Sequence, residues 1–167
     1  ELENEKEILI SGQEGVFALP PPVGEGSDWE TKKLVDREVS DVFVHDVDDD
    51  GKEEMLTIEP FHGDQLGFYE NENGNWTRST TYPIKFGHVV WAGELLDRPR
   101  IIAGSREGES DLVVLRWDSA ENDLVQDFVI DKEVGPTQIT VLNRNGRSLV
   151  FSANNGTGSV DLYELYE

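Results

Sequence analysis

The sequence predicts an all-β fold made of repeated antiparallel sheets. Four segments share one layout, in which an apolar run, a polar turn with glycine and a second apolar run follow each other. The turn glycines Gly15, Gly63, Gly108 and Gly156 are separated by 48, 45 and 48 positions. The runs are short and rich in Val, Ile, Phe and Tyr, as strands are. A repeat of about 40 to 50 residues is typical of β-propeller blades, each a four-stranded antiparallel sheet.

The strands can be assigned to four successive units along the chain. Paired strands are predicted at 8–19, 55–69, 101–115 and 149–163, inner strands at 41–44, 88–91 and 138–141, and outer strands near Trp29, Trp76 and Leu124. The units are 7–35, 36–82, 83–130 and 131–167, with three, four, four and three strands. The first unit lacks an inner strand and the last lacks an outer one. We therefore expect the C-terminal part of a propeller of about seven blades, completed by a companion segment.

Composition narrows the possible functions of these 167 residues, which together form one predicted domain. Lys and Arg total 14 against 35 Asp and Glu, a net charge of −21 that disfavours nucleic acids and anionic membranes as partners. The absence of cysteine excludes disulfides, thiolate zinc sites and cysteine nucleophiles. No run is apolar enough for membrane insertion, and residues 1–4 lack a basic-then-apolar signal. An acidic balance favours cation binding and an extracellular or periplasmic location over the cytoplasm, although a solvated acidic surface would give the same composition.

The strongest local motif is an Asp-rich loop at 46–54, DVDDDGKEE. Oxygen donors at alternate positions, followed by a glycine that permits a sharp turn, suit a hard cation such as Ca²⁺. An EF-hand would need a glutamate at its twelfth position, which is Thr57 here, and helices on both sides. An acidic turn without an ion remains the alternative. The predicted ligands are the carboxylates of Asp46, Asp48, Asp50 and Glu54 and the backbone carbonyl of Lys52.

This loop resembles the calcium loop of FG-GAP and VCBS propeller repeats, as in the integrin α head. The resemblance implies that Asp46, Asp48, Asp50 and Glu54 bind Ca²⁺ in a structural role. The corresponding turns at 94–99 and 143–147 lack the carboxylates, so one metal-bearing unit is expected. A weaker likeness joins 61–64, 88–94 and 103–106 to the propeller part of aldos-2-ulose dehydratase-like proteins, which eliminate water from oxidised sugars. The cupin-like remainder of those enzymes is absent from this sequence.

Blade geometry predicts a second site, called here the mouth, at the end opposite the acidic loop. The turns between second and third strands and the starts of the inner strands should meet there. His62 and His88 are candidate catalytic acid and base, with Arg106 stabilising an anionic intermediate. Turns are commonly polar, so each of these residues could equally be an ordinary turn residue without a functional role. The candidate ligand-binding residues are Gln13, Asp64, Glu107, Asn154 and Asn155.

Three functions follow from these two sites. The first is a calcium-stabilised module whose mouth binds a carbohydrate or a protein ligand. The second is a sugar lyase or dehydratase that uses the two histidines, and the third is a structural scaffold. A histidine pair with Asp64 or Glu107 would also suit a transition metal. No nucleophile motif, phosphate loop or dinucleotide fingerprint is present in the sequence.

Overall fold

The computed structural model describes residues 7–22, 24 and 28–166. Within these residues it contains fourteen β-strands and no helix, which confirms the all-β prediction. No helix of the described part is therefore long and apolar enough to cross a membrane. The sequence reading of residues 1–4, and positions 23, 25–27 and 167 of the predicted units, lie outside the described residues.

The strands form four antiparallel sheets with three, four, four and three members, the numbers expected from the sequence. The first sheet contains β1 (Ile8–Gly12), β2 (Gly15–Leu19) and β3 (Lys32–Val35). The second contains β4 (Asp41–His45), β5 (Glu54–Glu59), β6 (Gln65–Glu72) and β7 (Asn75–Pro83). The third contains β8 (Gly87–Leu95), β9 (Arg98–Ser105), β10 (Leu112–Asp118) and β11 (Asp123–Asp131). The fourth contains β12 (Pro136–Arg144), β13 (Arg147–Asn154) and β14 (Ser159–Leu165).

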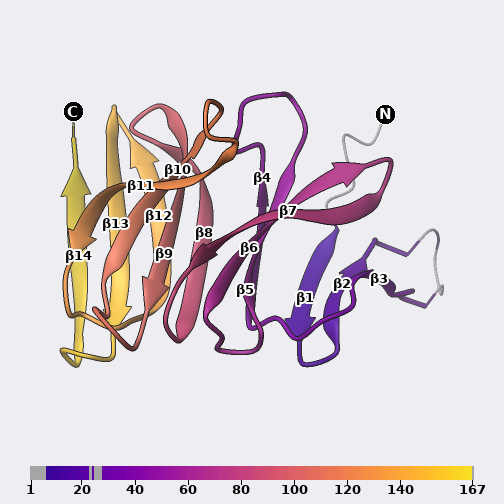
Figure 1. The fold of residues 1–167 in the computed structure, drawn as a ribbon, viewed down its shortest axis with the longest axis horizontal. Helices are drawn as coiled ribbons and strands as arrows, with labels where there is room; N and C mark the ends of the chain where they lie inside the picture. Colours follow the sequence, from indigo (N-terminus) through magenta and orange to yellow (C-terminus); the bar gives the residue numbers. More distant parts are fainter. Residues whose placement is uncertain (1–6, 23, 25–27, 167) are drawn as a thin grey trace.

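In each sheet the strands follow chain order, and the sheets themselves lie side by side along the longest axis of the molecule (Figure 1). The inner strands β4, β8 and β12 contact each other in succession, and β7 contacts both β3 and β11. Strand β1 contacts β4 as β5 contacts β8. The strands β1 to β3 thus correspond to the second, third and fourth strands of the later sheets, as the sequence predicted.

Three apolar cores lie between the four sheets. The first to second interface is built on Val16, Val39, Met55 and Tyr69, and the third to fourth on residues such as Ile102, Val114 and Val150. The second to third interface is the largest. It buries Leu56, Ile58, Leu66, Phe68, Ala92, Ile101, Ala103 and Leu115, among others. Each buried aliphatic or aromatic side chain contributes about 1.5–3 kcal/mol, so packing between sheets, more than any single loop, stabilises the fold.

Turns at the two ends of the sheets carry the two candidate sites. The chain passes from β4 to β5 at one edge of the molecule, where the acidic loop lies (Figure 1). It passes from β5 to β6 and from β9 to β10 at the opposite edge, as antiparallel order requires. At this edge, backbone hydrogen bonds connect one sheet to the next, from the Val39 amide to the Gly12 carbonyl at the end of β1 and from the Gly87 amide to the Gly63 carbonyl in the β5–β6 turn. The mouth residues are therefore held on a rigid frame.

Candidate functional site

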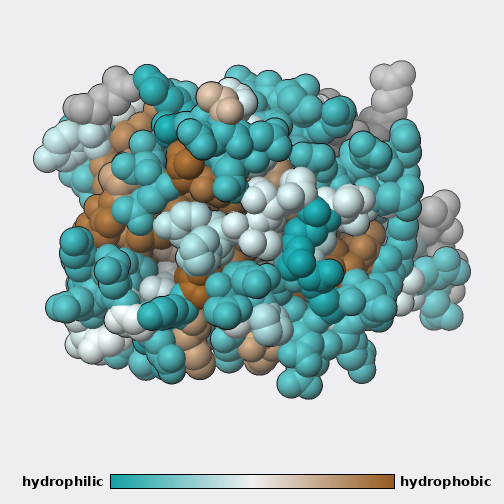
Figure 2. All heavy atoms as spheres, in the orientation of Figure 1, coloured by the Kyte–Doolittle hydropathy of each residue, from teal (hydrophilic) through white to brown (hydrophobic). Residues whose placement is uncertain are grey.

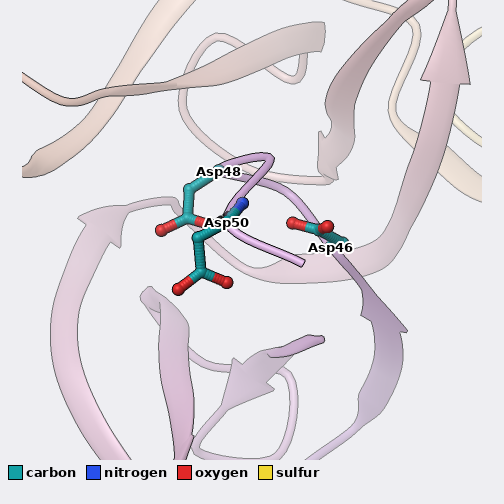
Figure 3. A group of neighbouring side chains, drawn as sticks. All are labelled: Asp46, Asp48 and Asp50. Carbon is teal, nitrogen blue, oxygen red and sulfur yellow. Dashed lines mark hydrogen bonds between the residues drawn. The ribbon is translucent and has the colours of Figure 1, made fainter. Parts of the chain in front are cut away.

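The acidic loop gathers three carboxylates at one point. Oxygen atoms of Asp46, Asp48 and Asp50 all lie within 4.8 Å of one another. Figure 3 shows the three side chains on a single turn of backbone, with Asp46 approaching from the start of the loop. Six-fold or higher coordination of Ca²⁺ uses oxygen ligands that converge in this way. The structure thus brings together three of the five predicted ligands.

Hydrogen bonds from the backbone fix the loop in this shape. The Gly51 amide donates to Asp46 Oδ2 (3.0 Å), the Asp50 amide to Asp48 Oδ1 (3.1 Å) and the Lys52 amide to Asp50 Oδ1 (2.8 Å). Gly51 has φ of 87°, a left-handed conformation that side chains disfavour, and this explains the glycine of the motif. The carboxylates are therefore positioned by the loop itself.

The electrostatics of the loop favour a bound cation. Asp46 Oδ1 is buried and has no hydrogen-bond partner among the described residues. Burial, followed by the charges of the three aspartates, raises the pKa of Glu54 to about 7. Burial and neighbouring carboxylates also raise the pKa of Asp48. Burial is thus the larger cost of ionising these carboxyls and repulsion between like charges the smaller, and a divalent cation would offset both.

The remaining two predicted ligands occupy different surroundings. Glu54 is the first residue of β5, and its Oε2 accepts a hydrogen bond from the Val47 amide (2.8 Å). This bond connects the end of the loop to its beginning. The Lys52 ammonium pairs with Asp50 Oδ2 at 3.0 Å, which lowers the pKa of Asp50. Coordination by the Lys52 carbonyl stays a prediction. Asp50 would have to exchange this ammonium for the ion.

The opposite end carries a cluster of rings that we call the aromatic patch, made of Phe61, His62, Phe86 and His88 with Arg106. The His62 and His88 rings stack with centroids 4.8 Å apart and an interplanar angle of 16°. Phe86 and Phe61 lie 5.2 and 4.5 Å from the His62 ring. The Arg106 guanidinium lies 5.5 Å from the centre of the Phe86 ring. The three predicted catalytic residues are thus brought together by Phe86.

Hydrogen bonds orient the polar members of the aromatic patch. Arg106 donates through Nη2 to Asn155 Oδ1 at 2.8 Å, which joins the third and fourth sheets. His88 Nδ1 lies 3.1 Å from the Thr137 carbonyl oxygen. A carbonyl only accepts, so Nδ1 donates and Nε2 is left as the basic atom. Burial, together with His62 and Arg106, lowers the pKa of His88, which is therefore neutral at pH 7.

Asp64 and Glu107 lie beside the aromatic patch, in a cleft of about 600 Å³ that is also lined by Tyr82, Lys85 and Asp111. The Glu107 amide bonds the Lys85 carbonyl, directly next to the bond from the Arg106 amide to Phe86. The cleft is thus a separate hollow, lined by chain neighbours of the aromatic patch and by none of its five members.

The other two predicted ligand-binding residues have separate environments. Gln13 is exposed in the turn between β1 and β2 and lines a hollow of about 550 Å³ on the first sheet. Asn154 is buried, accepts a hydrogen bond from Ser152 Oγ and donates to Asp161 and to the Tyr163 hydroxyl. Its side chain is committed to the last sheet and does not reach the surface. Position at a strand end suggested a mouth residue, but the inward register of β13 buries it.

The transition-metal alternative has no geometric support. Within the described residues, Asp46, Asp48 and Asp50 form the sole group of three or more His, Asp or Glu side chains arranged to hold an ion. The stacked geometry of His62 and His88 explains this, because parallel rings do not point their nitrogens at one common atom.

Phe86 is the member of the aromatic patch that sequence reasoning missed. It has φ of 49°, which is unusual for a bulky residue, and it lies in the short segment just before β8. Its place between His62 and Arg106 depends on contacts across the second and third sheets, which no local pattern reveals. Its neighbour Phe61 is 40% exposed beside His62, and an aromatic residue next to histidine in a polar turn was the available signal.

Comparison with protein-family models and with curated proteins finds no match to this chain. The structure alone therefore defines which class of protein this is. It is an all-β protein of four successive antiparallel sheets, with a cluster of acidic side chains at one end and an aromatic patch at the other.

Proposed function

We propose that this chain is a calcium-stabilised β-propeller module of the FG-GAP or VCBS type that binds a carbohydrate at the aromatic patch. Four sheets with contacting inner strands support the blade arrangement, and they would form part of a ring of about seven blades completed by a companion segment. An extracellular or periplasmic location fits a calcium-dependent fold, because calcium is abundant outside cells. A protein ligand at the aromatic patch is the alternative form of this proposal, and glycan binding would favour the carbohydrate form over it.

The calcium part of the proposal is carried by Asp46 Oδ1. A carboxylate oxygen that is buried without a partner is costly, and here it lies within a group of three convergent carboxylates. Oxygen-only donors on a tight loop match calcium better than a transition metal. The ion would join the start and end of the loop and stabilise the connection between β4 and β5.

The test is a thermal melt with and without calcium. Ligand present at 100 times its dissociation constant stabilises by about 2.7 kcal/mol, which raises the Tm of a chain this size by about 5–10 °C. The D48N variant should lose the rise. D49N removes the same charge from an exposed neighbour outside the acidic cluster and should keep it. An unchanged Tm on calcium addition to the parent protein would show that the loop does not bind the ion.

The carbohydrate part is carried by the stacked rings. Flat aromatic faces bind the apolar faces of sugar rings, and nearby donors fix their hydroxyl or carboxylate oxygens. Phe61 offers an exposed ring, and Arg106 and Asn155 offer donors at the Phe86 side of the same patch. Arg106 also gives this patch a positive charge on a chain of net charge −21.

Binding is tested on an array of neutral and carboxylated glycans, followed by titration calorimetry of the best ligand. The F61A and R106A variants should each weaken binding at least about tenfold. The R116A variant removes a partly exposed arginine that pairs with Asp118, away from the aromatic patch, and serves as the matched control. Equal binding by all four proteins would contradict this location of the site.

A second function, a sugar lyase or dehydratase, is favoured by the neutral His88. Its free Nε2 could remove a proton next to the carbonyl of an oxidised sugar, while His62 protonates the departing hydroxyl group, which leaves as water. Arg106 would stabilise the enolate that forms. In this case H62A should lose turnover while its Tm stays unchanged. Full turnover by H62A would remove His62 from catalysis, and binding without turnover would leave the module.

The third function is a structural scaffold. Neither the acidic loop nor the aromatic patch argues for it. It would be favoured if the calcium response were present while glycans failed to bind in every case.

A further inference from the structure

Exposed large apolar side chains are concentrated at the two ends of the series of sheets. The described residues include nine such side chains, and six of them lie on the first or last sheet. Val160 is the most exposed, at 77%, and hydrophobic atoms are visible over the last sheet at the left of Figure 2. The six residues are Ile8, Ile10, Leu142, Phe151, Val160 and Leu162.

Strand register places these residues on the outward faces. In the last sheet, Thr140, Phe151 and Leu162 are cross-strand partners. Their neighbours Val150 and Tyr163 point the other way and pack in the core against the third sheet. We call the surface formed by Leu142, Phe151, Val160 and Leu162 the trailing face.

The first sheet has an equivalent outward surface. Ile8 pairs with Leu19 and Ile10 pairs with Phe17, while the alternate residue Val16 lies in the core against the second sheet. Ile10, Phe17 and Leu19 line the hollow of about 550 Å³ described above. We call the surface formed by Ile8, Ile10, Phe17 and Leu19 the leading face.

The trailing and leading faces correspond to the two sides of an interface between neighbouring sheets. At each interface between sheets, the trailing side of one sheet covers the leading side of the next. Between the third and fourth sheets, for example, the trailing pair Ile102 and Val114 meets the leading pair Val150 and Tyr163. Phe151 and Leu162 occupy in the last sheet the place that Ile102 and Val114 occupy in the third. Among the described strands, none packs on the trailing face of the last sheet or on the leading face of the first.

We propose that the trailing face of one copy of this chain binds the leading face of a second copy, head to tail, and continues the internal packing of sheets. This rests on the companion segment of the proposed function and identifies that segment as another copy. Two copies bring eight sheets together, within the range of four to eight found in propellers, and one more than the expectation of about seven. In such a pair the exposed Val160 and Phe151 of one copy would meet the hollow on the leading face of the other.

Charge explains how such pairing should respond to salt. Each copy carries −21, so two copies repel at low ionic strength. Apolar contact between the faces is insensitive to screening and is strengthened by excluded salts. Association should therefore become tighter as NaCl or KCl is raised, whereas an interface of ion pairs would weaken.

The test is the molar mass of the purified chain in solution, by light scattering after gel filtration, at several protein concentrations and at low and high KCl. The parent chain should self-associate, and more so at high KCl. The F151D and I10D variants should each weaken association at least about tenfold. Both replaced side chains are exposed, so the monomers should keep their melting curves. A parent chain that is monomeric under every condition would overturn the proposal.

A mixing experiment separates head-to-tail pairing from pairing of like faces. F151D keeps an intact leading face and I10D keeps an intact trailing face, so their mixture should form a pair although neither variant associates alone. If I10D still associates by itself, the trailing faces bind each other and the proposal is wrong. F61D introduces the same charge at a side chain of equal exposure, 40% against 39% for Phe151. It should disturb the glycan site without changing association, so failure of one proposal is distinguishable from failure of the other.

Discussion

The second and fourth sheets each place a small hydroxyl residue and a tyrosine around a buried central residue, but that central side chain is a carboxylate in the second sheet and a neutral amide in the fourth. In the second sheet the hydroxyls of Thr57 and Tyr69 both donate to Glu59 Oε1 at 3.0 Å. In the fourth, Ser152 Oγ donates to Asn154 Oδ1 (2.6 Å), and Asn154 Nδ2 lies 3.2 Å from the Tyr163 hydroxyl. Both central residues are almost fully buried. The repeat thus conserves a buried tyrosine network while the central group changes.

The charge at Glu59 requires additional partners. Arg37 and Arg78 lie 3.2 and 3.5 Å from Glu59 Oε2, whereas the amide of Asn154 needs no counter-charge. A buried carboxylate is thus tolerated where arginines are available, and the fourth sheet uses a neutral side chain instead.

The connections between the first two strands of these two sheets also differ in length and in charge. Eight residues, 46–53, connect β4 to β5, and this connection carries the group of aspartates. Two residues, Asn145 and Gly146, connect β12 to β13, both with positive φ as a tight hairpin requires. Since a two-residue turn is sufficient to join these strands, the longer acidic loop needs a reason beyond connectivity, and the proposed cation binding would supply one.

The largest expected effect is that of removing the Glu59 side chain. E59A leaves the buried hydroxyls of Thr57 and Tyr69 without an acceptor and creates a cavity, so we expect a loss of about 3 kcal/mol in the free energy of unfolding. Urea denaturation followed by circular dichroism measures it. E59Q keeps an acceptor of the same shape and should lose less. A loss below that of E59Q would show that the carboxylate is dispensable.

The network around the neutral Asn154 should be less sensitive to removal of its central side chain. In N154A the Ser152 and Tyr163 hydroxyls lose one partner each, but Tyr163 still donates to Asp131 at 2.9 Å. We expect a loss of about 2 kcal/mol, smaller than for E59A. Urea denaturation of the two variants side by side makes the comparison. If N154A were the more damaging change, the charged network would not be the more demanding one.

How much of this the sequence could predict depends on the distance over which each feature is encoded. The strands, their grouping into sheets and the convergence of Asp46, Asp48 and Asp50 follow local patterns, and the structure contains them. The pairing of Glu59 with Arg37 and Arg78 crosses turns and sheets, and no local pattern indicates it. Asn154 illustrates the same limit, because one step in strand register decides whether a side chain is a ligand or part of the core.

Calcium affinity should depend on pH through Glu54. The pKa of this carboxyl is raised from 4.5 to about 7 in the folded protein, so between these values the folded chain holds a proton that the unfolded chain has lost. The stability of the calcium-free protein therefore falls as pH rises through this range. Calcium needs the ionised carboxylate, so affinity should rise about tenfold per pH unit below pH 7 and level off above it.

Titration calorimetry between pH 5.5 and 8 measures this slope, and buffers of different ionisation enthalpy report the released proton. E54Q has no proton to release at this position and should show a flatter profile. An equal slope in E54Q would assign the pH dependence to the aspartates of the loop.

The smallest expected effect tests the tight turn on the neutral side of the comparison. Gly146 has φ of 71° and open space where a side chain would stand, so G146A is penalised by backbone conformation alone, by about 1 kcal/mol. Gly12 also has open space, but its φ is not positive, and G12A should change stability little or raise it slightly. Thermal melts of the two variants separate strain from packing. Equal losses would mean that the positive φ of Gly146 adds no penalty for a side chain at this turn.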